Sequence, residues 1–171
     1  MDGVTIRTFR PAEWRSYRDL RLRALQDSPN AFSTTYAEAS ARSDEYWMSR
    51  LIQLSADTDR LLVAERNGQR CGMAWGRLQP SEENTAQVFQ MWVAPEHRGF
   101  GTGRMLLEAI IDWARQHGAV SIVLGVTCGN EPAWRLYESS GFKAYGELDA
   151  LRSGSELKVQ SMKLGISRDA A

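Results

Sequence analysis

The sequence predicts an α+β fold, in which a mixed, mostly antiparallel β-sheet is flanked by helices. Three observations predict it. An Asn67-Gly68 pair joins two strand-like runs, a glycine-rich turn links a strand to an amphipathic helix, and a short apolar strand follows that helix. The first feature is typical of an antiparallel hairpin, and the other two are typical of a βαβ crossover. The length of 171 residues fits a single domain over 1–171.

The amino-terminal third is predicted to hold one strand and two helices. Residues 4–9 alternate between apolar and polar, which is typical of a strand. A helix that begins near Pro11 and ends near Asp27 carries one apolar stripe. Ser43 and the two acidic residues after it predict the cap and the first turn of a second helix.

The rest of the chain alternates between strands and helices. Asn67-Gly68 lies between strand-like runs at 60–65 and 70–78, and such a pair is the strongest short hairpin signal. The further elements are a strand at 86–93, a helix from 101 that Gly118 ends, a strand at 120–126, a helix at 130–139, and closing strands at 142–148 and 156–164. The predicted order is β-α-α-β-β-β-α-β-α-β-β.

The composition excludes several classes of partner. The 21 basic residues balance 21 acidic ones, so no global positive field attracts nucleic acid or anionic lipid. Cys71, Cys128 and two histidines are too few for a zinc site, and no disulfide framework is visible. The amino terminus lacks the apolar segment of a signal peptide, and the longest apolar stretch is too short to span a membrane. We therefore expect no metal, no nucleic acid, no membrane contact, and a cytoplasmic location.

The most informative stretch is the glycine-rich turn at 93–105, between a strand and a helix. Three glycines let the backbone approach a phosphate closely, and the amino terminus of a helix attracts an anion. Arg98 and Arg104 add positive charge on either side. The stretch is not a P-loop, because no lysine precedes Lys143, and it does not match GxGxxG. The alternative is a turn that merely connects the strand to the helix.

A second group of residues follows the strand at 120–126. Asn130 can cap the next helix, on which Ala133 and Tyr137 lie four residues apart and share a face. Gly141 and Phe142 then lead into a strand. The two groups lie in order along the chain, about thirty residues apart.

The pattern Arg-x-x-Gly-x-Gly after a Val-x-Pro strand end, followed by Asn-x-x-Ala-x-x-Leu-Tyr-x-x-x-Gly-Phe, resembles the GNAT superfamily of acyl-CoA-dependent N-acetyltransferases over essentially the whole chain. The resemblance implies a GNAT-like fold, with acetyl-CoA as co-substrate between splayed strands at 86–93 and 120–126. The residues it implies for acetyl-CoA are Met91, Trp92 and Val93 for the pantetheine arm, Arg98, Gly99, Phe100, Gly101, Thr102, Gly103 and Arg104 for the pyrophosphate, and Asn130, Ala133 and Tyr137 for the opposite wall.

The implied reaction is direct attack of a primary amine on the thioester. A backbone amide near Val93 would polarise the carbonyl, and Tyr137 would protonate the leaving thiolate as the general acid. The alternative is that Tyr137 is a half-buried aromatic residue. The strand at 86–93 carries Gln87 and Gln90 but no acid, so it offers no base. The remaining candidates for the base are Glu82, Glu83, Glu147, Asp149 and water.

The acceptor pocket is expected between the first two helices, their connection, and the loops before residue 86 and after 147. Phe32, Tyr36 and Trp47 are candidates for an aromatic wall, with Gln87 on the acceptor side, although the aromatics would serve equally in the core. A small-molecule amine is the favoured acceptor. The alternatives are a protein, peptide or aminoacyl-tRNA acetyltransferase and a non-catalytic acyl-CoA-binding domain. A strand edge near the C-terminus offers a route to a homodimer, and residues 167–171 are expected to be disordered.

Overall fold

A computed structural model describes residues 3–79 and 83–166 and contains one mixed sheet. The strands follow the order β1-β2-β3-β4-β5-β8-β6, with β7 also paired to β8. Every pair is antiparallel except β4 with β5, so the predicted fold class is confirmed. The strands are β1 (Val4–Thr8), β2 (Asp59–Arg66), β3 (Gln69–Gln79), β4 (Thr85–Val93), β5 (Ser121–Thr127), β6 (Lys143–Ala144), β7 (Asp149–Ala150) and β8 (Lys158–Gly165).

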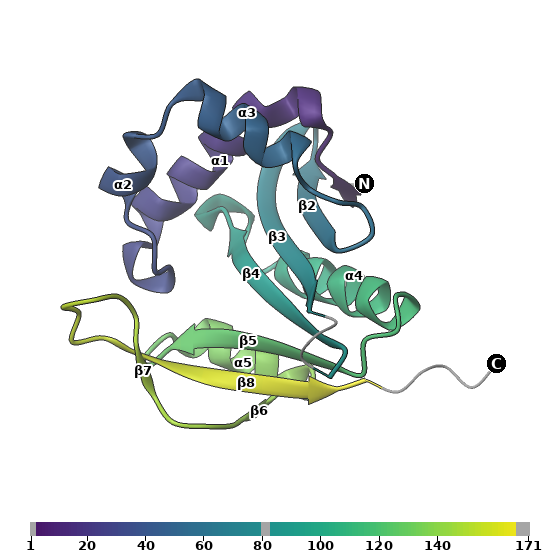
Figure 1. Cartoon of the computed structure of the whole chain (residues 1–171), viewed down its shortest axis with the longest axis vertical. Coiled ribbons are helices and arrows are strands. Elements are labelled where there is room, and N and C mark those ends of the chain that lie inside the picture. Colours follow the sequence, from purple (N-terminus) through teal and green to yellow (C-terminus); the bar gives the residue numbers. More distant parts are fainter. Residues whose placement is uncertain (1–2, 80–82, 167–171) are drawn as a thin grey trace.

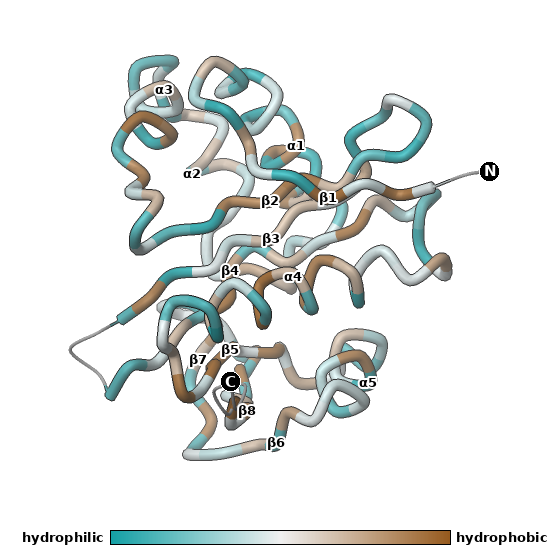
Figure 2. The backbone as a smooth tube through the Cα atoms, turned by 90° about the vertical axis from the view of Figure 1, so that its right-hand side faces the viewer, coloured by the Kyte–Doolittle hydropathy of each residue, from teal (hydrophilic) through white to brown (hydrophobic). Residues whose placement is uncertain are grey.

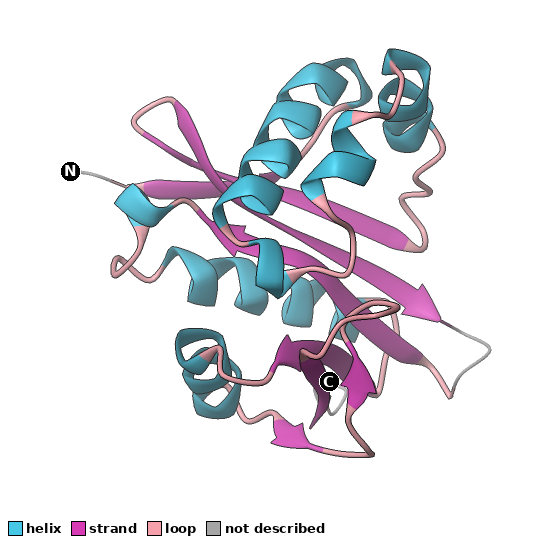
Figure 3. Ribbon diagram, turned by 90° about the vertical axis from the view of Figure 1, so that its left-hand side faces the viewer, coloured by secondary structure: helices cyan, strands magenta, loops and turns pink. Residues whose placement is uncertain are grey.

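The helices cover both faces of this sheet. Helices α1 to α3 lie on one face of β2, β3 and β4, whereas α4 lies on the other face (Figures 1 and 3). Within the described residues no helix is long and apolar enough to cross a membrane. The helices are α1 (Trp14–Asp27), α2 (Tyr36–Ser40), α3 (Asp44–Ile52), α4 (Thr102–Gln116) and α5 (Glu131–Ser139), with 3₁₀ turns at Pro11–Glu13, Pro29–Ala31 and Pro95–His97.

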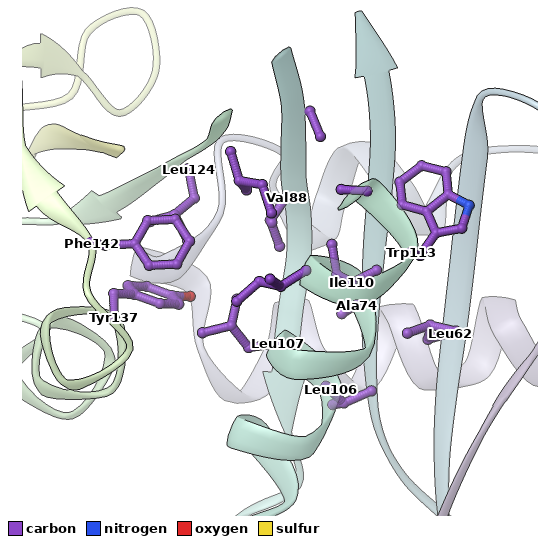
Figure 4. Close-up of a cluster of buried hydrophobic side chains, with 14 of the residues drawn as sticks. Leu62, Ala74, Val88, Leu106, Leu107, Ile110, Trp113, Leu124, Tyr137 and Phe142 are labelled. Atoms are coloured by element: carbon purple, nitrogen blue, oxygen red, sulfur yellow. The ribbon is translucent and has the colours of Figure 1, made fainter. Parts of the chain in front are cut away.

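Two hydrophobic cores lie on opposite faces of the sheet, because successive strand residues point to opposite sides. Leu62 packs with α4 and α5 in one core, whereas its neighbour Val63 packs with α1 and α3 in the other. Figure 4 shows the first core, in which Leu107 and Ile110 of α4 lie between the strands and Tyr137. Hydrophobic colour follows α4 and the adjacent strands, in contrast to the hydrophilic loops around them (Figure 2).

Strands β4 and β5 separate soon after they pair. Only Thr85 to Gln87 of β4 pair with β5, and the strands then diverge (Figure 1). A bulge in β4 accompanies the separation: the register against β3 shifts, and Gln90 takes a positive φ of 55°. The Tyr17 hydroxyl of α1 donates a hydrogen bond of 2.7 Å to Oε1 of Gln90. The predicted splay of these two strands is confirmed.

The structure corrects two predicted segments. The strand expected at 142–148 is wrong: only Lys143–Ala144 and Asp149–Ala150 pair with β8, and Gly146 turns between them with a φ of 70°. Tyr145 and Leu148, which lie within the expected strand, are exposed. The connection before Ser43 holds the short helix α2, which was not predicted. Its signal was a capping box, in which Thr35 accepts from the Glu38 amide and Glu38 accepts from the Thr35 amide.

Candidate active site

The gap between β4 and β5 exposes backbone amides of β4. The Ala94 amide donates to the Cys71 carbonyl of β3 over 2.8 Å. Because backbone N–H groups alternate sides along a strand, the Val93 amide points the other way, toward the gap, and Met91 belongs to the bulge and has no partner in β3. Beyond Gln87 no β5 residue pairs with them. These amides can therefore donate to a ligand.

A cavity of about 520 Å³ occupies this gap. Four of the predicted site residues line it: Phe32, Gln87, Met91 and Tyr137. The cavity wall also includes residues of α1, α3, β3, β5 and the loop around β7. Residues that were not predicted but line it include Arg21, Arg50, Trp75, Arg77, Val123, Leu124 and Thr127. The expected acceptor elements and the splayed strands thus meet in one place.

Tyr137 lies on the cavity wall and is otherwise buried, with 6% of its surface exposed. Its ring packs 6.0 Å from that of Phe142, and its hydroxyl points away from α5 toward the side of Leu107 and β4 (Figure 4). Burial raises the pKa of Tyr137 to about 12. The phenol therefore holds its proton at neutral pH and can donate it into the cavity.

The glycine-rich turn before α4 forms a cradle of free amides. Gly99 and Gly101 have φ values of 85° and 82°, and a Cβ atom at either position would meet no atom within 4 Å. Within the described part of the chain, no hydrogen bond uses the backbone amides of residues 99–104. These amides precede the positive end of α4, so they fit the pyrophosphate of a coenzyme A ester. Gly103 also lets α4 approach Leu136 of α5 closely.

The side chains of the two arginines in this turn already have partners in the protein. Arg98 donates to the Val93 carbonyl over 2.9 Å and to Asp27 over 2.8 Å. Its amide donates to the Pro95 carbonyl. Arg104 donates to the Ser139 hydroxyl over 2.8 Å. Arg98 therefore fastens the end of β4 to α1, and the free amides begin at Gly99.

Asn130 and Ala133 lie where α5 begins. The Asn130 side chain caps the helix by accepting from the Ala133 amide over 3.4 Å, as predicted. Asn130 also lines a second cavity of about 350 Å³. This cavity shares Ala31 and Thr127 with the first, so the two cavities adjoin.

The candidate aromatic wall is only partly assembled. Phe32 lines the cavity, but Tyr36 does not line it and is 41% exposed. Trp47 is buried in the core against Tyr17, which is the alternative that the sequence left open. Trp92 is likewise buried and donates its indole N–H to Asp27 over 3.0 Å, and neither Trp92 nor Val93 lines the cavity.

Sequence reasoning missed Arg21, which is almost fully buried on the cavity wall. A signal was present. Arg21 lies four residues after Tyr17 and four before Leu25, so it interrupts the apolar stripe of α1 with a charge. A charged residue on the buried face of a helix needs a partner or a function.

Among the candidate bases, Asp149 is the carboxylate that lines the cavity. Glu83 and Glu147 are exposed and do not line it. Glu82 lies outside the described residues. His97 lies in the 3₁₀ turn at Pro95–His97, inside the glycine-rich turn, and does not line the cavity with Tyr137.

Comparison with known proteins gives a consistent result. The model of the acetyltransferase (GNAT) family matches residues 14–142. Mycothiol acetyltransferase of Thermomonospora curvata is 34% identical over 145 residues, which are 84% of this chain but 46% of that protein. The chain thus spans about half the length of this curated relative.

Solved structures share the whole fold. An acetyltransferase of Salmonella typhimurium, solved with its cofactor acetyl-CoA, has a TM-score of 0.79 and 25% identity, over 99% of this chain and 97% of that one. A ribosomal-protein-alanine N-acetyltransferase of Brucella melitensis has a TM-score of 0.75 and 26% identity, over 95% and 99% of the two chains. The chain belongs to the GNAT family of acetyltransferases.

Proposed function

We propose that this chain is an acetyl-CoA-dependent N-acetyltransferase that transfers the acetyl group to a primary amine of a small molecule. The observation that carries the proposal is the cavity between the splayed strands. There Met91 of β4 and Tyr137 line one space, Val93 follows two residues further along the unpaired part of β4, and the amide cradle before α4 comes after the end of β4. Carbonyl polarisation, proton donation and phosphate binding each have a group in the protein.

In a direct transfer, the Val93 amide and Tyr137 have separate roles. The Val93 amide donates to the acetyl oxygen, where negative charge develops during attack. The new C–N bond forms as the C–S bond breaks, and the sulfur accepts the Tyr137 proton. The N–H proton that the attacking nitrogen gives up on becoming an amide returns to the Tyr137 oxygen, so the phenol is restored. A free thiol has a pKa of about 8.5, below that of Tyr137. Because the same apolar surroundings also destabilise the thiolate, the two pKa values approach each other inside the cavity.

The attacking amine must lose a proton, and we assign Asp149 as the base. Its support is its position on the cavity wall: Glu83, Glu147 and Asp149 are all exposed, but of the three only Asp149 lines the cavity. The chain of proton transfer then runs from the ammonium to Asp149 and on to solvent at the cavity mouth. Water alone is the competing acceptor, and a variant at residue 149 distinguishes them.

A small acceptor suits the dimensions of the site. The cavity volume of about 520 Å³ falls in the range of small-molecule pockets. Residues of the connection after α1 and of the loop around β7 line two parts of its wall, and Arg152 joins these segments by donating to the carbonyls of Pro29, Phe32 and Ser33. The relatives named for mycothiol also favour a small molecule. The second candidate is a protein or peptide acceptor, favoured by the structural similarity to the ribosomal-protein-alanine N-acetyltransferase.

Three further assignments belong to the same proposal. A cytoplasmic location is supported by the two free cysteines, Cys71 and Cys128. A single domain is supported by the one sheet that runs from β1 to β8. The homodimer stays a prediction: β8 pairs with β5 on one side and with β6 and β7 on the other, so the short strands β6 and β7 form the sheet edge at that end. The expected tail at 167–171 lies outside the described residues.

A thiol-release assay tests the proposed function. Acetyl-CoA is incubated with panels of small amines, free amino acids and amino-terminal peptides, and free CoA is measured. We expect turnover with members of the small-amine or amino-acid panels. Turnover with peptides alone would favour the second candidate. Binding of CoA without turnover on any panel would identify a non-catalytic domain.

A further inference from the structure

Arg21 carries a buried charge that no carboxylate of the described residues neutralises. Its residue is 6% exposed, and its Nη1 atom is buried without a hydrogen-bond partner in the described part of the chain. The guanidinium stacks 4.6 Å from the ring centroid of Phe32. Burying an ion without a counter-ion costs several kcal/mol even after relaxation. A residue retained at this cost calls for a ligand that offsets it.

The positive charges of Arg42 and Arg50 add to the charge of Arg21 at this place in the fold. Burial is the main cause that lowers the pKa of Arg21 to about 10, and the positive charges of Arg42 and Arg50 also lower it. At neutral pH the guanidinium is therefore still protonated. Within the described residues, none of the three arginines forms an ion pair with a carboxylate. The cluster is a site of uncompensated positive charge.

Aromatic rings hold these guanidinium groups in place. Arg42 lies 4.5 Å from the Tyr46 ring centroid, and Arg50 lies 4.5 Å from that of Trp75. Stacking uses the flat face of a guanidinium and leaves its N–H edge free to bind an anion. The arrangement is thus preorganised for a planar oxyanion.

The cluster opens into the cavity that holds Tyr137. Arg21 and Arg50 both line this cavity. The third arginine on its wall, Arg77, is already paired with Asp59 over 2.9 Å. Among the described residues that line the cavity, Asp149 is the carboxylate, whereas Arg21 and Arg50 are arginines without an ion pair. An anionic group on the acceptor would therefore be attracted to the α1 side of the cavity.

We propose that the acceptor is a primary amine that also carries a carboxylate, and that Arg21, assisted by Arg50, binds this carboxylate. This inference rests on the proposed function and narrows its substrate class to amino acids and their acidic derivatives. A bidentate pair between a guanidinium and a carboxylate satisfies the free N–H groups of Arg21. The pair also fixes the orientation of the acceptor, so its amine is held at a constant distance from the Val93 end of the gap.

Equilibrium binding of the reaction products tests the inference without turnover. The CoA-loaded protein is titrated calorimetrically with a panel of N-acetyl amino acids and with the corresponding N-acetyl amino acid amides. We expect the tightest carboxylate to bind at least about tenfold more tightly than its amide, and Arg21→Leu to abolish that ratio. Arg15→Leu is the matched control, because Arg15 is an exposed arginine on the same helix. It should keep the ratio.

Several outcomes would overturn the inference. These are amides that bind as tightly as carboxylates, a ratio that survives in Arg21→Leu, and a panel in which no carboxylate binds. A protein that binds CoA and acetylates neutral amines as readily as amino acids would retain the proposed function and contradict only this inference. Absence of CoA binding would instead contradict the proposed function itself.

The stability of the variants separates a binding role from a structural one. Because Arg21→Leu removes an unpaired buried charge, the Tm of the ligand-free variant should equal or exceed that of the unmodified chain. Arg21→Lys keeps the charge but loses the planar fork, so we expect it to retain part of the preference for carboxylates. A marked fall in Tm of Arg21→Leu would assign the residue to the core and contradict the inference.

Discussion

Tyr137 is suited to hold a proton and release it only when strong negative charge develops nearby. Its burial raises its pKa to about 12, so almost no phenolate exists at neutral pH. The ring is held by Phe142, and its hydroxyl borders the cavity. Substitution by phenylalanine removes the proton while retaining this packing.

We therefore predict that Tyr137→Phe lowers kcat by about 10²- to 10⁴-fold and changes the KM values much less. Initial rates of CoA release with saturating acetyl-CoA measure the effect. Tyr145→Phe is the control, because Tyr145 is a second tyrosine on the cavity wall with an exposed ring. A loss of less than about threefold in Tyr137→Phe would remove the general-acid role.

The assigned base gives a prediction that depends on pH. Asp149→Asn removes the proton acceptor, so kcat/KM should fall by about 10²-fold near neutral pH. The difference in kcat/KM between Asp149→Asn and the unmodified chain should become smaller as the pH approaches the pKa of the amine, because more of the free amine is then present in solution. Glu147→Gln, in the exposed neighbour, is the control. Equal pH profiles for Asp149→Asn and the unmodified chain would assign the step to water.

At the scale of the elements, Asp27 joins the end of α1 to β4 and the glycine-rich turn. It accepts hydrogen bonds from Ser28, from the Trp92 indole and from Arg98. Burial acts to raise the pKa of Asp27, but these bonds and the charge of Arg98 leave the pKa below its usual value. The stabilisation of the fold by ionised Asp27 is thus complete above the unfolded pKa of about 4. It is lost as the pH falls through the folded pKa.

Asp27→Asn should consequently destabilise the fold by about 1–2 kcal/mol at pH 7, because the bond to Arg98 loses its charge. At a pH below the folded pKa the two proteins should become similar in stability, since Asp27 is then protonated. Urea unfolding at both pH values measures the difference. Asp19→Asn, on the exposed side of α1, is expected to change little at either pH. A difference that is independent of pH would contradict the electrostatic explanation.

The connection between α1 and α2 depends on Arg152, which donates to three of its carbonyl groups. Arg152→Ala should loosen this wall of the cavity and raise the KM of the acceptor by about tenfold, since a charged hydrogen bond contributes about 1.5–3 kcal/mol. The KM of acetyl-CoA should stay constant, because β4 and the glycine-rich turn do not contact Arg152. Steady-state kinetics with each substrate varied in turn measure both values. Equal changes in the two KM values would indicate general unfolding instead.

At the scale of the whole molecule, locally encoded elements were predictable. Asn67 and Gly68 adopt φ values of 52° and 75°, as the hairpin requires, and Ser43 caps α3 by accepting from the Tyr46 amide. These features depend on residues adjacent in sequence. The bulge at Gln90 instead has a hydrogen-bond partner, Tyr17, that is 73 residues away in the sequence. No pattern of neighbouring residues predicts this bulge. The segment at 142–148 was expected to be one strand, but Gly146 turns the chain within it.

The site shows the same division. Phe32, Gln87, Met91 and Tyr137 were predicted for the site and do line one cavity. The partners of Arg98 were not predictable, since Asp27 belongs to a distant helix. Likewise, sequence alone does not show which charge on an apolar stripe lacks a tertiary partner, and so it does not distinguish Arg21 from a paired arginine.

A crystal structure with bound acetyl-CoA tests the central claim most directly, namely that the coenzyme occupies the gap between β4 and β5. We predict that the acetyl oxygen lies within hydrogen-bond distance of the Val93 amide and that the Tyr137 hydroxyl lies beside the sulfur. The pyrophosphate should contact the amides of residues 99–104. Acetyl-CoA bound outside this gap, or a thioester remote from both Val93 and Tyr137, would contradict the account.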